Sequence, residues 1–274
     1  MTIAPAVPWT RADQPPAPLV VALHWDDFLL WRTGRKITHR TAAGQLVRLP
    51  PPPVPGQHEA NIGPTGEGKT NHVVPLLQRR KYAVALDPKG EDDTLAKSGF
   101  TRVLSLPPRG RLPRKIRRDL EEGRPVRLIV GGAMRTAAQE AELRRLMGEA
   151  IDFCKFSGHW TIFADEFEVL TSNQMFNFAP QFNAMLNTAR ARKISVWTAY
   201  QAQAWVSKHA IRQARQATLW TTGDRDMIKA VSQALGRNWR DVAPAVDLLP
   251  PFHSLTIRRG ANSGPMIITI APEL

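Results

Sequence analysis

The residues with the most specific chemistry form a run of eight that fits the phosphate-binding pattern GxxxxGK(S/T). The run consists of Gly63, Pro64, Thr65, Gly66, Glu67, Gly68, Lys69 and Thr70. Its glycines allow the backbone to curl around a phosphate with the N–H groups pointing inward, where a Cβ would obstruct the torsions. Lys69 is expected to reach the β- and γ-phosphates, and Thr70 to bind Mg²⁺ through its hydroxyl. This Walker A loop therefore predicts a site for ATP and Mg²⁺.

Two acidic residues after an apolar run form the second candidate element. Residues 161–164 read Thr-Ile-Phe-Ala, and Asp165 and Glu166 follow them. This is the form of a Walker B strand, so Asp165 is expected to hold the water shell of the metal ion and Glu166 to take a proton from the attacking water. Apolar strands followed by acidic residues are common in α/β proteins, and this interpretation depends on the loop at 63–70. Together the two elements predict hydrolysis as well as binding.

Gln201 is the third candidate. It stands at the end of the apolar run 194–200, where parallel sheets bind their ligands, and it could sense the γ-phosphate. On spacing alone, a surface glutamine that caps the next helix is the better account.

The elements that must position these residues alternate between strand and helix patterns. Apolar strand-like runs occur at 58–62, 82–86, 101–106, 126–130, 160–164, 194–200 and 217–222, with helical patterns at 69–80 and 137–156. Residues 255–257 and 266–270 indicate a closing strand pair. Such alternation is typical of a mostly parallel sheet flanked by helices. We therefore predict an α/β, RecA-like P-loop NTPase fold with a short N-terminal extension and a C-terminal strand pair.

A proline tract at 50–55 divides the chain. Residues 1–56 are predicted to form a Pro-rich arm followed by an edge element at 19–30, and residues 57–274 to form the P-loop ATPase domain. No run reaches the roughly 18 apolar residues of a transmembrane helix, although docking on a membrane surface stays open. Cys154 is the only cysteine, which excludes an intrachain disulfide and a cysteine zinc site and fits a reducing cytoplasm.

The charge of the chain favours a polyanionic partner. It has 37 Lys and Arg against 24 Asp and Glu, a formal net charge of +13. A basic surface gains affinity for DNA or RNA because each neutralised phosphate releases counterions. A dense basic cluster consists of Arg109, Arg111, Arg114, Lys115, Arg117 and Arg118. We predict a flexible loop here that grips a nucleic-acid backbone without reading bases; a solvated loop or a subunit contact is the alternative.

The order of these motifs resembles the FtsK/HerA superfamily of nucleic-acid motor ATPases over roughly residues 57–272. The resemblance is carried by the loop at 63–70, the stretch Asp87-Pro88-Lys89-Gly90-Glu91, the pair Asp165 and Glu166, and the basic residues 190–193 before the strand that ends at Gln201. It implies a homo-oligomer, a hexameric ring that threads double-stranded DNA and binds ATP at subunit boundaries. It also favours the γ-phosphate role for Gln201.

A ring of this kind also requires an arginine that acts across the subunit boundary. The resemblance makes Arg190 and Arg192 the candidates, for this role or for a phosphate contact within their own subunit, with Arg192 preferred. The alternative is that both are solvated charges at a helix end.

Within the superfamily, a compact core is most similar to the genome-packaging ATPases of membrane-containing viruses. That branch implies packaging into a preformed capsid, contact with capsid portal or vertex proteins, and a location in the host cytoplasm or on the virion. A conjugation or type IV secretion coupling ATPase, and a phage morphogenesis ATPase that does not translocate DNA, are the alternatives.

Overall fold

The computed structural model describes residues 20–36, 38–40, 46–49, 54–90, 93–107, 111–132, 136–201, 207–260 and 265–270. Ten strands form one sheet in the order β1-β12-β11-β10-β4-β9-β8-β5-β7-β6, and within it only β11 runs against the others. The strands are β1 (Val20–His24), β4 (His58–Ile62), β5 (Tyr82–Asp87), β6 (Thr101–Arg102), β7 (Val126–Gly131), β8 (Thr161–Ala164), β9 (Ser195–Tyr200), β10 (Ala214–Leu219), β11 (Ser254–Arg258) and β12 (Met266–Ile270). This mostly parallel sheet with flanking helices confirms the predicted α/β P-loop NTPase fold.

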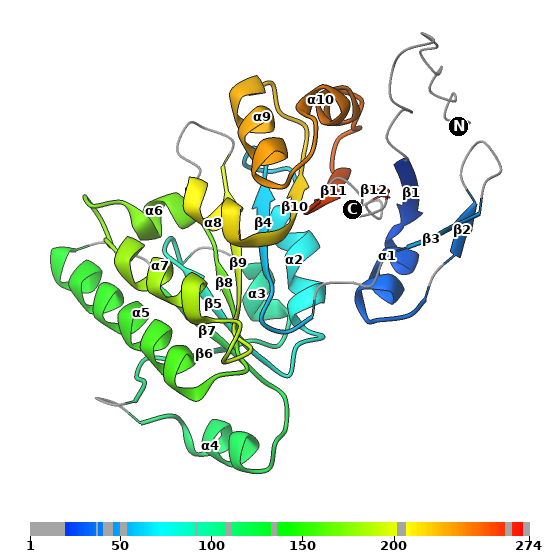
Figure 1. Cartoon of the computed structure of the whole chain (residues 1–274). Coiled ribbons are helices and arrows are strands. Elements are labelled where there is room, and N and C mark those ends of the chain that lie inside the picture. Colours follow the sequence, from blue (N-terminus) through cyan, green and yellow to red (C-terminus); the bar gives the residue numbers. More distant parts are fainter. Residues whose placement is uncertain are drawn as a thin grey trace, which may run out of the picture.

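Helices cover both faces of the sheet (Figure 1). One face packs against α1 (Trp25–Arg32), α2 (Lys69–Leu77) and α3 (Asp93–Lys97). The other face packs against α4 (Arg114–Glu121), α5 (Ala137–Ser157), α6 (Phe167–Thr171), α7 (Ala179–Thr188), α8 (Lys208–Gln213), α9 (Arg225–Ala234) and α10 (Trp239–Asp247). Because parallel strands need crossover connections, these helices bring the carboxyl ends of every described strand of the sheet except β11 to one edge.

The apolar run that begins at residue 19 becomes β1, which pairs in parallel with β12 at one end of the sheet. After α1, β2 (Thr38–Arg40) and β3 (Leu46–Arg48) form a separate antiparallel pair. Within the described ranges, no helix is both long enough and apolar enough to cross a bilayer. Most of the arm lies in residues 1–19, outside the described part of the chain.

Three elements differ from the sequence predictions. The strand expected at 101–106 pairs only through Thr101 and Arg102, because the chain turns towards Pro107. The strand expected at 217–222 instead spans Ala214–Leu219, directly after α8. The basic segment expected as a flexible loop contains α4, which begins after Pro113 and buries Ile116 against the sheet. Two apolar side chains, Ile116 and Leu120, on an otherwise charged helix leave too weak a hydrophobic pattern to predict it.

Candidate nucleotide site

The glycine-rich loop connects β4 to α2 at the carboxyl edge of the sheet. Gly66 and Gly68 have φ of +86° and +82°, a left-handed conformation that favours glycine. Gly63 is required for a different reason: a Cβ there would lie 2.6 Å from Cβ of Trp220. The first glycine is therefore fixed by packing against the chain beyond β10, and the other two by backbone conformation.

Lys69 begins α2 and lies over the loop. Its ammonium donates hydrogen bonds to the carbonyl oxygens of Gly63 and Pro64, both at 2.7 Å. Burial lowers the pKa of Lys69, and the nearby carboxylates of Asp165 and Glu168 oppose that shift. These carboxylates favour the charged ammonium that a phosphate contact requires.

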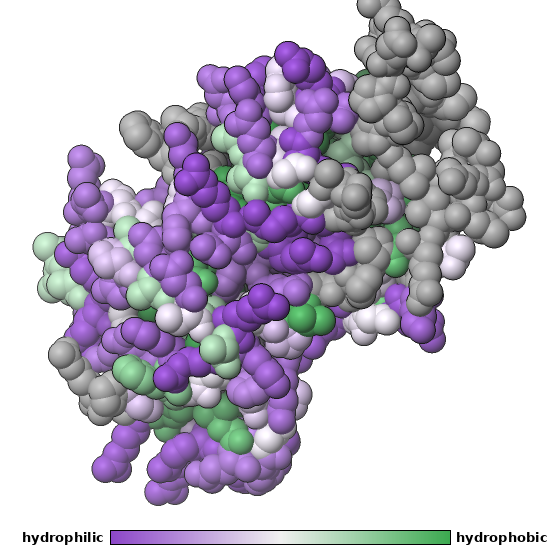
Figure 2. Space-filling view, viewed as in Figure 1, coloured by the Kyte–Doolittle hydropathy of each residue, from purple (hydrophilic) through white to green (hydrophobic). Residues whose placement is uncertain are grey.

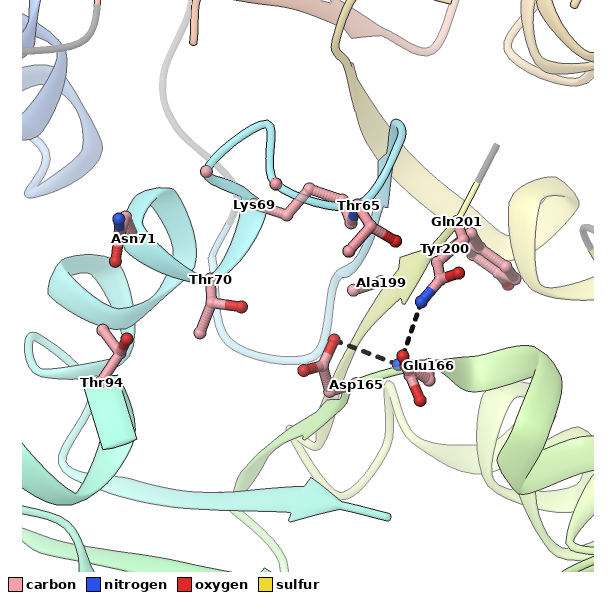
Figure 3. Close-up of a pocket in the computed structure, with 12 residues that line it drawn as sticks. Thr65, Lys69, Thr70, Asn71, Thr94, Asp165, Glu166, Ala199, Tyr200 and Gln201 are labelled. Carbon is pink, nitrogen blue, oxygen red and sulfur yellow. Dashed lines mark hydrogen bonds between the residues drawn. The ribbon is translucent and has the colours of Figure 1, made fainter. Parts of the chain in front are cut away.

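A cavity of about 260 Å³ opens beside the loop. The side chains of Thr70, Asp165 and Gln201 all line it, although they come from α2 and from the ends of β8 and β9 (Figure 3). The complete lining consists of Thr65, Gly66, Gly68, Lys69, Thr70, Asn71, Thr94, Asp165, Glu166, Ala199, Tyr200 and Gln201. The cavity fits a nucleoside triphosphate with Mg²⁺. The glycine loop and the ammonium of Lys69 suit the phosphates, and the hydroxyl of Thr70 and the carboxylate of Asp165 suit Mg²⁺.

Glu166 occupies the centre of a hydrogen-bonded cluster at this edge. It directly follows Asp165, whose Oδ1 accepts from the Glu166 N–H at 3.1 Å, and it has a φ of +45°, strained for a residue with a Cβ. Gln201 donates its side-chain N–H to Oε1 of Glu166 at 2.6 Å, and the ammonium of Lys89 forms an ion pair with the same oxygen. The other oxygen, Oε2, is buried and has no hydrogen-bond partner among the described residues.

Two residues of this cluster were not assigned a role from the sequence. Lys89 extends from the turn after β5, which is closed by a 2.8 Å hydrogen bond from the Gly90 N–H to Oδ1 of Asp87. The ion pair with Glu166 raises the pKa of Lys89. In the sequence, the only indication that Lys89 belongs to the site was its place in the stretch Asp87 to Glu91, which carries the family resemblance. Glu91 lies outside the described residues. Glu168 accepts from the Gln201 backbone N–H at 3.2 Å, and burial raises the pKa of Glu168.

Arg190 and Arg192 lie at the opposite edge, before the amino end of β9. Gln201 follows the carboxyl end of this six-residue strand, and a strand rises about 3.3 Å per residue. Neither arginine therefore reaches a phosphate bound at the loop of the same chain. The Arg192 guanidinium donates to the carbonyls of Lys155 and Phe156 at 3.0 and 3.3 Å, at the end of α5. Arg190 is exposed.

The basic cluster is remote from the cavity. Arg114, Lys115, Arg117 and Arg118 lie on α4, at the bottom of Figure 1, and Arg111 precedes the helix; all five are exposed. Arg109 lies outside the described residues. Hydrophilic residues cover much of the face shown, including the region of α4 (Figure 2).

The arrangement supplies what phosphoanhydride hydrolysis needs. The loop and Lys69 offer hydrogen-bond donors and charge for the phosphates, and Thr70 and Asp165 offer oxygen ligands for Mg²⁺. Mg²⁺, when bound, would neutralise phosphate charge. Glu166 directly follows Asp165 and also lines the cavity, so its carboxylate is available to act as a general base for water.

Comparison with known proteins shows similarity at the level of structure alone. No family model and no curated protein matches the chain. The genome-packaging NTPase B204 of Sulfolobus turreted icosahedral virus 2, solved with AMPPCP, matches with a TM-score of 0.54 and 16% identity over 80% of this chain and 99% of B204.

Two further solved structures share the fold as well. VirB4 of Thermoanaerobacter pseudethanolicus matches with a TM-score of 0.58 and 11% identity, over 88% of this chain and 97% of VirB4. The cytoplasmic domain of the type VII secretion ATPase EccC of Thermomonospora curvata matches with a TM-score of 0.50 and 17% identity. The match covers 87% of this chain and 28% of the EccC chain. These similarities bear out, for the fold, the resemblance to motor ATPases of the FtsK/HerA type.

Proposed function

We propose that this protein is an ATPase that translocates double-stranded DNA, and that it packages a viral genome into a preformed capsid. The observation that carries the ATPase part is the convergence of Lys69, Thr70, Asp165, Glu166 and Gln201 on one cavity. A phosphate loop alone serves many reaction types. Its combination with a general base and a side-chain amide that contacts that base supports hydrolysis.

The DNA part rests on charge and on fold. The net charge of +13 favours a polyanion, and the exposed cations of α4 offer contacts for a phosphate backbone. B204, which shares the fold over nearly its whole length, is described as a genome-packaging NTPase. The match to EccC, described as a type VII secretion ATPase, supports a second candidate, a conjugation or secretion ATPase. An ATPase of phage morphogenesis that does not translocate DNA is the third.

In the proposed motor, the subunits form a hexameric ring with ATP at their boundaries, and a portal or vertex protein anchors the ring to the capsid in the host cytoplasm or on the virion. An arginine from the neighbouring subunit would stabilise charge on the transferring phosphoryl group. Because the Arg192 guanidinium is engaged by the end of α5, the exposed Arg190 becomes the preferred candidate.

The decisive experiment measures ATP turnover by the purified protein with and without double-stranded DNA, after its oligomeric state has been determined. We expect DNA to stimulate turnover, and Lys69→Ala to abolish both the basal and the stimulated rate, because the phosphates lose their charged partner. Basal turnover without stimulation in a hexameric preparation would contradict translocation and favour the third candidate. Absence of all turnover would contradict the ATPase proposal.

The DNA surface can be tested separately with the double variant Arg114→Ala, Lys115→Ala. Removing each cation that binds a phosphate should reduce the slope of log affinity against log salt by about 0.9. Arg144, an exposed arginine of α5 that pairs with Glu140, supplies a control substitution of the same charge. Equal salt slopes for the double variant and wild type would show that Arg114 and Lys115 do not bind the DNA backbone.

A further inference from the structure

An exposed aromatic side chain stands beside the phosphate loop. Phe252, in the connection between α10 and β11, is 44% exposed, and its φ is +63°. A left-handed conformation is strained for a bulky residue, and an exposed ring forgoes hydrophobic burial. Strained residues of this kind cluster at active sites and ligand clamps, where the surrounding structure holds them in place.

Phe252 is held against the loop itself. The backbone N–H of Phe252 donates to Oε2 of Glu67 at 3.4 Å, and Cδ1 of its ring lies 3.7 Å from the position that a Cβ on Gly68 would occupy. Pro250 and Pro251 precede it and restrict the backbone of the connection. The ring therefore borders the last glycine of the cradle, next to Lys69.

The position of Phe252 in the sheet order places it on one flank of the loop. The connection leads into β11, which is antiparallel to β10, so it lies at the same edge as the carboxyl ends of β10 and β4. Asp165 and Gln201 follow β8 and β9, on the other side of β4. A nucleotide whose γ-phosphate faces Asp165 and Gln201 directs its nucleoside away from them, towards the flank that carries Phe252.

We propose that Phe252 forms the nucleobase subsite of this protein, with the base of the bound nucleotide stacked on its ring. The inference deepens the proposed function and rests on its nucleotide-binding part, without requiring DNA. Every base has an aromatic face, so a stacking platform holds bases without distinguishing among them. The subsite should therefore separate nucleotides from inorganic polyphosphate more strongly than it separates adenine from guanine nucleotides.

The test compares the equilibrium binding of AMPPNP and of inorganic tripolyphosphate, each with Mg²⁺, by calorimetry. Phe252→Ala should weaken AMPPNP binding about tenfold or more, the effect of losing one base–aromatic stack, and should leave tripolyphosphate binding unchanged. Phe252→Trp should keep the affinity for AMPPNP, because it retains an aromatic face. The matched control is Phe156→Ala, which removes a ring that is 72% exposed at the end of α5 and should alter neither affinity.

Two results would overturn the subsite. Unchanged AMPPNP binding by Phe252→Ala would show that the base does not contact the ring. Equal losses for AMPPNP and tripolyphosphate would show that Phe252 shapes the phosphate loop or packs against another protein. If the wild-type protein bound neither ligand, the proposed function would fail together with the subsite, so the two failures are distinguishable.

Discussion

The charged and polar residues at the two ends of β8 and β9 differ in how completely their hydrogen bonds are satisfied. At their carboxyl ends, Glu166 and Glu168 each keep one buried oxygen without a hydrogen-bond partner in the described part of the chain. At their amino ends, Arg192 donates to the last carbonyls of α5, and Nδ1 of His58 accepts the Val196 N–H at 3.0 Å. Polar groups at the amino ends hold the fold together, whereas at the carboxyl ends Glu166 lines the candidate cavity.

Glu166→Gln gives the sharpest test of the carboxyl end. The amide keeps the size of the side chain but cannot take a proton from water, so we expect turnover to fall on the order of 10³, within the range for loss of a general base. Binding of AMPPNP should persist, because the loop and Lys69 are unchanged. Single-turnover hydrolysis and calorimetry measure the two quantities. Turnover close to wild type would show that Glu166 is not the base and would direct attention to Glu168.

Lys89 is expected to have a smaller effect, as a positioning residue that acts through Glu166. Lys89→Ala removes the ion pair to Oε1 but leaves the hydrogen bond from Gln201, so the carboxylate keeps one of two restraints. We expect kcat to fall about tenfold with KM for ATP unchanged, the signature of an interaction made outside substrate binding.

Two variants serve as controls for Lys89. Lys89→Arg should restore most of the rate, since it keeps the positive charge. Lys81→Ala, at another lysine of the same sheet region, should leave the rate unchanged; the Lys81 ammonium lies 5.2 Å from the ring centroid of Tyr82, beside β5. An increase in KM without a change in kcat would show that Lys89 binds ATP directly and does not position Glu166.

Arg192→Ala should have the smallest effect, on stability alone. A cation at the carboxyl end of a helix contributes about 0.3 to 1 kcal/mol, so thermal unfolding of the variant should shift down by about 1 to 4 °C. Turnover should be unchanged, and Arg190→Ala should leave the melting temperature unaltered. If Arg192→Ala instead reduced turnover on the order of 10³ at unchanged stability, Arg192 would be the arginine that acts across the subunit boundary.

The sequence predicted the site residues that stand at the ends of strands or at the starts of helices. Lys69, Thr70, Asp165 and Gln201 each stand at a strand end or a helix start, and parallel strands bring such positions to one edge. Phe252 and the contact of Lys89 with Glu166 depend on how connections fold back over that edge. Those contacts join residues from separate crossover units, which periodicity along the chain does not encode.

Because periodicity does not encode contacts between distant elements, the sequence predicted neither the helix α4 nor the distance of Arg190 and Arg192 from Gln201. A basic run broken by Gly110 and Pro113 has the composition of a loop, yet the buried Ile116 and the partly buried Leu120 dock a helix against the core. For Arg190 and Arg192, the motif order indicated proximity to Gln201 along the chain. The intervening β9 carries them to the far edge, because a strand separates its two ends more than any other element of equal length.

The pairing of β1 with β12 has a consequence for the order of events during synthesis. Val20 pairs with Met266, so 246 residues (266 minus 20) separate the partners, and β12 is the only strand beside β1 in the described sheet. At about 5 to 20 residues per second, the ribosome needs about 12 to 50 s to make the partner after β1 has emerged. The first strand of the described residues is therefore among the last to find its place, and a nascent chain can complete its phosphate loop long before its sheet is closed at this edge.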